Sequence, residues 1–137
     1  MNIDVGDYLI SDDKNLIQFD KVFDLLSKTY WASHRSKETV QKSLENSLCF
    51  GVYHNDVQIG LARAVTDYAV VYYLCDVVID ENFRGQGLGK AMMKCVTEHE
   101  SLAPLIGYLG TEHAHGLYEK FGFKLTHGTM MCKRPEN

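Results

Sequence analysis

The sequence of 137 residues lacks the features that mark several classes of protein. It has only two prolines and no low-complexity tract, which excludes a fibrous or disordered chain. Its four cysteines form no CxxC pair and have no histidine at zinc-ligand spacing, so we expect reduced cysteines and no bound metal. No apolar run approaches the roughly 18 residues of a membrane span, and no leader-like segment opens the sequence. These absences favour a cytoplasmic globular protein without a membrane partner.

Positive charge is also scarce. Fourteen Lys and Arg against eighteen Asp and Glu give a net charge of −4, and Lys133 with Arg134 form the only adjacent basic pair. This pattern leaves no electrostatic footprint for a nucleic acid. A hydrophobic content of 45% is ordinary for a globular protein. Because a chain of this length buries about two-thirds of its unfolded surface, we expect a single domain over residues 1–137.

Hydrophobic periodicity predicts elements in the order β-α-α-β-β-β-α-β-α-β. The run from Val70 to Asp80 is apolar on both faces, which is typical of a central strand. Ser36 is expected to cap the second helix, and Gly122 fits the C-terminal stop of the last one. The order favours an α/β (α+β layered) domain with a mixed sheet. The expected strands are 8–10, 48–53, 57–65, 70–80, 105–109 and 123–131, and the expected helices are 18–29, 36–48, 88–99 and 114–121.

A glycine-rich turn, RGQGLGK from Arg84 to Lys90, joins the central strand to the strongest predicted helix. Its glycines allow a close backbone approach to a ligand, and the first N–H groups of the helix lack internal partners. Such a turn suits phosphate, although glycines alone also make a plain tight turn. The dinucleotide pattern GxGxxG fails because Lys90 stands at its sixth position, and the P-loop pattern fails at Arg84 and Ala91. The pattern Arg/Gln-xxGxG matches from Arg84 to Gly89.

With its preceding strand and following helix, this turn resembles that of the GCN5-related N-acetyltransferases, the GNAT superfamily. The segment AHGLYEKFGF, from Ala114 to Phe123, looks like the second signature of that family, Ala-x-x-Leu-Tyr-x-x-x-Gly-Phe. The resemblance covers nearly the whole chain. It implies a mixed, mostly antiparallel central sheet flanked by about four helices on both faces. It also implies acetyl-CoA as the cofactor and CoA as the product, with the pyrophosphate held by the backbone amides of the turn.

The resemblance assigns the cofactor site residue by residue. The backbone of the strand segment 77–79 would pair with the pantetheine arm, and one N–H would polarise the thioester carbonyl, while the side chains pack in the core. Thr111 stands where many members have Asn, so a hydroxyl replaces an amide there. The cofactor-binding residues implied in this way are Val77, Val78, Ile79, Arg84, Gly85, Gln86, Gly87, Leu88, Gly89, Lys90, Thr111 and Tyr118.

Acetyl transfer to an amine needs a neutral amine, a donor for the developing oxyanion and a proton for the leaving thiolate. The resemblance implies Tyr118 as the proton donor, whereas its spacing alone fits a core tyrosine on an apolar stripe. Asp76 lies in the central strand, where a buried carboxylate is costly unless it is paired. It is a candidate general base, acting directly or through a water, or else a structural acceptor of N–H groups.

The acceptor is expected where the first two helices meet the sheet. Tyr30, Trp31 and Arg35 lie in the connection between these helices, and Tyr73 lies on the central strand. An aromatic and basic loop suits a substrate with an apolar part and a carboxylate, although Trp31 also fits as a loop anchor and Arg35 as a solvated residue.

The prediction is therefore an acetyl-CoA-dependent N-acetyltransferase that acts on a primary amine of a small molecule by direct attack in a ternary complex. A homodimer is compatible with the resemblance. Two alternatives stay open at this point. One is a non-catalytic acyl-CoA-binding sensor or interaction domain, and the other is a nucleotide-binding protein that uses the same turn.

Overall fold

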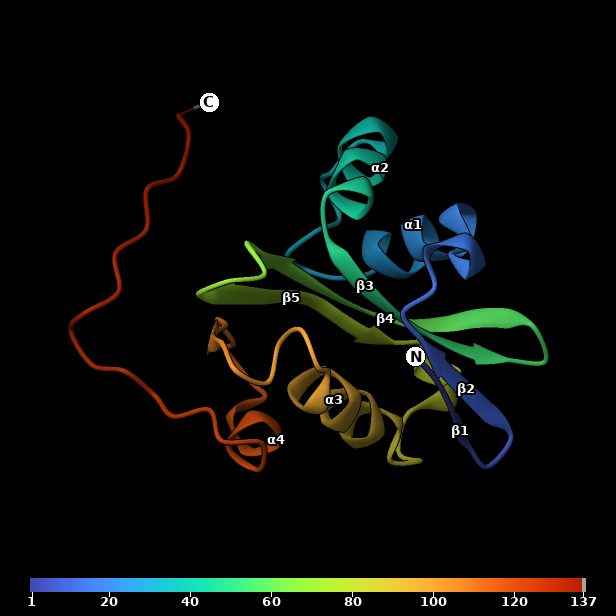
Figure 1. Cartoon of the computed structure of the whole chain (residues 1–137). Helices are drawn as coiled ribbons and strands as arrows, with labels where there is room; N and C mark the ends of the chain where they lie inside the picture. The colour runs from blue at the N-terminus through green and yellow to red at the C-terminus, as the bar shows by residue number, and fades with distance from the viewer. Residues whose placement is uncertain (137) are drawn as a thin grey trace.

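The computed structural model describes residues 1–136 and contains one six-stranded sheet with helices on both faces (Figure 1). Within these residues, no helix has the length and apolar character that crossing a membrane requires. The strands are β1 (Asn2–Val5), β2 (Tyr8–Ser11), β3 (Leu48–His54), β4 (Val57–Thr66), β5 (Val71–Ile79) and β6 (Ile106–Tyr108). The helices are α1 (Phe19–Ser27), α2 (Lys37–Glu45), α3 (Leu88–Glu98) and α4 (His115–Glu119), with 3₁₀ turns at Lys14–Leu16 and Glu81–Phe83.

The sheet follows the order β1-β2-β3-β4-β5-β6 and is antiparallel up to β5. Strand β6 is parallel to β5 and pairs with it only from Val71 to Tyr73. Beyond Tyr73, β5 continues to Ile79 while β6 has ended at Tyr108. In the described chain, this second half of β5 therefore has a strand neighbour on one side only. The predicted mixed, mostly antiparallel sheet is confirmed.

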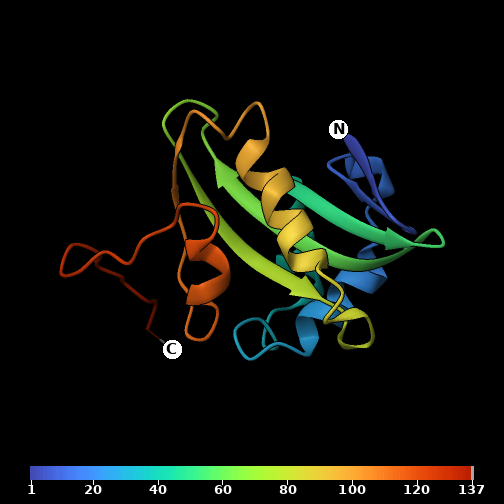
Figure 2. The ribbon, with the colours of Figure 1, turned by 90° about the horizontal axis from the view of Figure 1, so that it is seen from below.

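Each face of the sheet carries its own core. One face is covered by α1 and α2, where Leu26, Val40 and Leu61 are almost fully buried. The other is covered by α3, which lies across the strands with α4 beside it (Figure 2). Its core includes Phe50 and Met92, both fully buried. Burial on both faces explains why the central strands read as continuous apolar runs rather than as alternating ones.

Local sequence signals account for several of the element boundaries. The Ser36 side chain accepts a hydrogen bond from the Thr39 backbone N–H at 3.1 Å and so caps α2, as expected. Asn55 and Asp56 both adopt positive φ, which a tight turn between β3 and β4 requires. Gly122 has a φ of +92° just after α4, in the left-handed region that favours glycine at a helix end.

Two predictions about strands were wrong. The segment 123–131 is not a strand: it runs clear of the sheet (Figure 1), and Gly128, with a φ of +73°, interrupts its extended course. Strand β1 was missed because three of its four residues are exposed, so it has no apolar run to reveal it. It forms by pairing with β2 through the turn at Gly6, which also has a positive φ.

The contrast between the core and the tail gives a stability prediction. Leu61 is fully buried, whereas Leu125 in the tail is 63% exposed. We expect Leu61→Ala to lower the free energy of unfolding by about 2–5 kcal/mol, since it leaves a cavity. Leu125→Ala should change it by less than about 0.5 kcal/mol. Urea unfolding measures both, and a large cost at Leu125 would show that the tail packs as a strand after all.

Candidate active site

The glycine-rich turn has the geometry of an anion site. Gly85 and Gly87 both have a φ of +78°, which only glycine adopts without strain. In the described part of the chain, no atom outside each glycine and its two chain neighbours lies within 4 Å of where a Cβ would stand, so the turn is open on that side. Gly87 is the N-cap of α3, and within residues 1–136 no side chain caps this end. The first N–H groups of α3 therefore stay available, at the positive end of the helix dipole.

Side chains fix this turn from two strands. The Arg84 Nε donates to the carbonyl of Ile79, the last residue of β5, at 3.1 Å. The Tyr8 hydroxyl on β2 donates to the Gln86 side-chain oxygen at 2.5 Å. The turn is thus anchored by hydrogen bonds that do not involve the first amides of α3. Those amides are left for a ligand.

Helix α4 brings the second signature beside the first. A Cβ placed on Gly89, in the first turn of α3, would meet the Leu117 side chain at 3.9 Å. The next residue, Tyr118, is 9% exposed and packs its ring edge-on against Phe123, with the centroids 6.2 Å apart. Burial raises the pKa of the Tyr118 phenol above its ordinary value. The phenol is therefore protonated at neutral pH and able to donate.

A cavity of about 680 Å³ lies between β6, α4 and the chain that follows α4. Its lining includes Thr111, His115 and Tyr118 but does not reach the turn 84–90. The Thr111 hydroxyl accepts a hydrogen bond from the Ala114 backbone N–H at 3.0 Å, which holds the chain as it enters α4. Thr111 thus has a structural contact in addition to the cofactor contact expected from the sequence.

Asp76 lies at a β-bulge in β5. Leu61 pairs with Val78 and Arg63 with Cys75, so two steps along β4 match three steps along β5. Asp76 has a φ of +53°, an unusual conformation for a residue other than glycine. The extra residue shifts the alternation of side chains along the strand. The Asp76 side chain accordingly faces the α1–α2 connection, as its bonding partners show.

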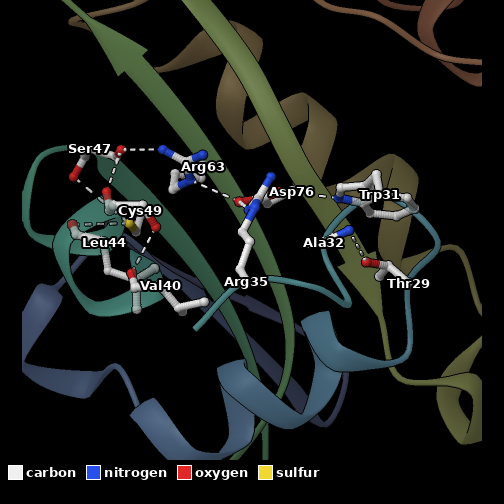
Figure 3. A network of polar contacts seen from close by, with 11 residues as sticks. Thr29, Trp31, Ala32, Arg35, Val40, Leu44, Ser47, Cys49, Arg63 and Asp76 are labelled. Atoms are coloured by element: carbon white, nitrogen blue, oxygen red, sulfur yellow. Dashed lines mark hydrogen bonds and ion pairs between the residues drawn. The ribbon is translucent and has the colours of Figure 1, made fainter. Parts of the chain in front are cut away.

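Three donors surround the Asp76 carboxylate (Figure 3). Arg35 Nη1 and Arg63 Nε donate to its Oδ2 at 2.8 and 2.9 Å, and Trp31 Nε1 donates to its Oδ1 at 3.1 Å. Arg63 also donates to the Ser47 hydroxyl at 2.9 Å. Burial raises the pKa of the Asp76 carboxyl, but the hydrogen bonds and charges of the two arginines outweigh it, and the pKa lies below its ordinary value. The carboxylate is ionised, and each of its oxygens accepts at least one hydrogen bond.

The residues predicted to meet the acceptor fall into two groups. Trp31 and Arg35 turn inward to Asp76 (Figure 3). Tyr30 and Tyr73 are 63% and 47% exposed. The Tyr30 ring also lies 6.3 Å from the ring of His113, which precedes α4, so the α1–α2 connection meets the segment that leads to Tyr118.

Sequence reasoning missed the parts played by Arg63 and Ser47. A signal was present in β4, because Arg63 stands in an otherwise apolar alternating set that includes Leu61 and Val65. A charged residue at an inward position of a strand needs a buried partner. The strand beside it offered Asp76, and the pairing register supplies the contact.

Comparison with known proteins agrees with the two signatures. A family model described as "Acetyltransferase (GNAT) domain" matches residues 45–125. A Gibberella zeae protein named "Putative acetyltransferase FG08082" is 31% identical over 113 residues, which cover 68% of this chain and 64% of that protein. The crystal structure of a "putative acetyltransferase belonging to the gnat family" from Xanthomonas campestris pv. campestris superposes with a TM-score of 0.90, at 33% identity over 96% of each chain.

The chain therefore belongs to the GNAT family of acetyltransferases. A GNAT family acetyltransferase from Elizabethkingia anophelis, solved with acetyl-CoA bound, shares the fold at a TM-score of 0.68 and 20% identity, over 89% of this chain and 79% of that one. Acetyl-CoA is the acetyl donor of the family, as the resemblance implied. The match spans 64% of the Gibberella zeae relative, so the two chains correspond over only part of that protein's length.

The engaged carboxylate gives a second stability prediction. Asp76→Asn removes one charge of a buried cluster and leaves two guanidinium groups uncompensated, so it should cost about 3–5 kcal/mol of unfolding free energy at pH 7. Because the folded-state pKa of Asp76 lies below that of the unfolded chain, the contribution is complete above about pH 5 and is lost as the pH falls through the folded-state pKa.

Urea unfolding of the wild type and Asp76→Asn at pH 7, 5 and 3 measures this cost. The difference between them should be equal at pH 7 and 5 and smaller at pH 3. Asp4→Asn, an exposed carboxylate on β1, is the matched control and should have little effect. A cost at Asp76 no greater than at Asp4 would mean that the cluster contributes nothing to stability.

Proposed function

We propose that the protein is an acetyl-CoA-dependent N-acetyltransferase that moves an acetyl group to a primary amine of a small molecule by direct attack in a ternary complex. The observation that carries this proposal is the meeting of α3 and α4. The open glycine turn with its free amides lies beside the helix that bears a protonated, buried Tyr118. An anion site and a proton donor are two of the parts that acetyl transfer from a thioester needs.

The residues present fit acetyl-CoA. The amides at the start of α3 and the open faces of Gly85 and Gly87 suit the pyrophosphate. The free edge of β5 after Tyr73 suits an extended arm that carries amides of its own, because unpaired backbone groups at a strand edge accept an added strand. When bound, acetyl-CoA would supply an activated acetyl group as a thioester.

The roles of the chain's own residues follow from this placement. Tyr118 would donate its phenolic proton to the leaving sulfur, since burial keeps the phenol protonated. The backbone of Val77 and Val78, beside the bulge at Asp76, would hold the arm and offer an N–H to the thioester oxygen. Tyr30 and Tyr73 present exposed aromatic surface that would contact the apolar part of an acceptor.

Calorimetric titration with acetyl-CoA tests the cofactor site, with ATP and NAD as controls. We expect the wild type to bind acetyl-CoA but neither ATP nor NAD. Gly87→Ala should weaken binding by at least about tenfold, because a side chain at a φ of +78° strains the turn that presents the amides. The matched control is Gly128→Ala in the tail, where φ is +73° and affinity should not change. Tight ATP or NAD binding would instead favour a nucleotide-binding protein.

A Tyr118→Phe variant tests the chemistry. Removing one hydroxyl removes the proposed proton donor while the ring stays packed against Phe123. We expect turnover to fall by about 10²–10⁴-fold, with affinity for acetyl-CoA changed less than about twofold. Release of CoA thiol in the presence of a panel of aliphatic and aromatic primary amines measures the rate.

The same panel separates the remaining functions. Acetyl-CoA binding with no thiol release on any amine, or on a lysine-containing peptide, would support a non-catalytic acyl-CoA-binding domain. Turnover on the peptide alone would replace the small-molecule acceptor by a protein amine. Full activity of Tyr118→Phe would overturn the role proposed for Tyr118 without touching the cofactor site.

A further inference from the structure

Asp76 joins two parts of the molecule that are far apart in the sequence. Its carboxylate accepts hydrogen bonds from Trp31 and Arg35, which lie in the connection between α1 and α2. It also accepts one from Arg63 in the neighbouring strand β4. Its own backbone forms the bulge of β5. One residue therefore ties the side of the site that would receive the acceptor to the strand that would hold the thioester arm.

The contacts do not suit a general base. A base needs an oxygen or nitrogen that the amine can reach and a pKa near the working pH. The Asp76 side chain is 0% exposed, and both of its oxygens accept hydrogen bonds from side chains. Although burial alone would raise its pKa, the two arginines hold the pKa of Asp76 below its ordinary value, which weakens its affinity for a proton.

The bulge requires a support of this kind. A residue other than glycine in the left-handed region costs of order 1–3 kcal/mol and persists only where its surroundings fix it. At Asp76, with a φ of +53°, three directional hydrogen bonds to the side chain supply that fixation. Losing them would let β5 relax toward a regular strand and would turn the following backbone groups.

We propose that Asp76 is a positioning residue: its carboxylate clamps the α1–α2 connection onto the bulge of β5 and so holds the backbone of Val77 and Val78 in the direction that the thioester requires. This inference rests on the proposed function. It assigns the acceptor-side residues Trp31 and Arg35 a role in donor binding as well, because both act through the same carboxylate. Deprotonation of the amine then falls to a group other than Asp76.

Trp31 reports on the clamp directly. It is the only tryptophan of the chain, so indole emission, excited at wavelengths that the eight tyrosines do not absorb, has a single source. Its indole N–H bonds to Asp76, and Arg35 bonds to the other oxygen of the same carboxylate. Arg35→Gln removes neither Trp31 nor the Asp76 oxygen to which Trp31 bonds. If the cluster acts as a unit, this substitution should nevertheless shift the Trp31 emission.

The test compares two ligands that share the turn 84–90 but differ at the bulge. In the proposed placement, acetyl-CoA would extend along β5, whereas 3′-phospho-ADP, the nucleotide half of the same molecule, would not. For Asp76→Asn and Arg35→Gln we expect the affinity for acetyl-CoA to fall by about tenfold or more and that for 3′-phospho-ADP to change less than about twofold. Asp4→Asn is the control and should alter neither affinity. Circular dichroism and Trp31 emission are recorded for each variant.

The outcomes separate the two hypotheses. If the wild type binds neither ligand, the proposed function fails. If it binds both, neither variant changes either affinity or the Trp31 emission, and Asp76→Asn abolishes the release of CoA thiol, then Asp76 is the base and the clamp is wrong. An equal loss of both affinities would make Asp76 a merely structural residue and would also overturn the proposal. Should Asp76→Asn fail to fold, Arg35→Gln carries the same comparison, since Arg35 is partly exposed at 22%.

Discussion

The end of pairing between β5 and β6 is the constraint on which the rest of the site depends. The two parallel strands pair only up to Tyr73 and Tyr108, and β5 then continues to Ile79 with only β4 beside it in the described chain. Backbone N–H and C=O groups at such an edge need partners, and an extended edge is a template for another extended chain. A pantetheine arm, which carries amides of its own, suits such an edge. The glycine turn follows at the end of the same strand, where a phosphate at the end of that arm would lie.

The two signatures act together because the helices that carry them are in contact. Gly89 lies in the first turn of α3 and Leu117 lies in α4, and a Cβ at Gly89 would stand within 4 Å of the Leu117 side chain. This contact brings the free amides of α3 and the phenol of Tyr118 to one side of the sheet. The anchoring of Arg84 and Gln86 to β5 and β2 keeps the turn in place without using those amides. In the proposed function, the glycine turn would therefore bind the cofactor, and α4, beside α3, would carry the proton donor.

Most of the fold was predictable because it follows from periodicity and turn chemistry. Ser36 and Gly122 each mark a helix end that the structure confirms. The strand expected at 123–131 was a wrong prediction. The residue pattern of this segment does not show whether a sheet edge is available to pair with it, and Gly128 interrupts the extended run. The face that Asp76 takes was also out of reach, although Arg63 in β4 indicated a buried acidic partner. A bulge reverses which face a residue takes, and no pattern in the sequence reveals the extra residue at that point.

A buried cluster of one carboxylate and two guanidinium groups is a poor device for stability alone. Taking such ions out of water costs several kcal/mol each, and well-packed apolar residues of similar volume often do as well or better. Apolar packing, however, is non-directional, so it would fill the space under the α1–α2 connection without fixing the backbone of β5. Hydrogen bonds with defined angles at both carboxylate oxygens do fix it, and they do so at the one residue of β5 whose φ is positive. The free energy that is lost in burying the Asp76 carboxylate is thus offset by a structural gain. The carboxylate holds β5 in a bulged conformation that a residue other than glycine disfavours.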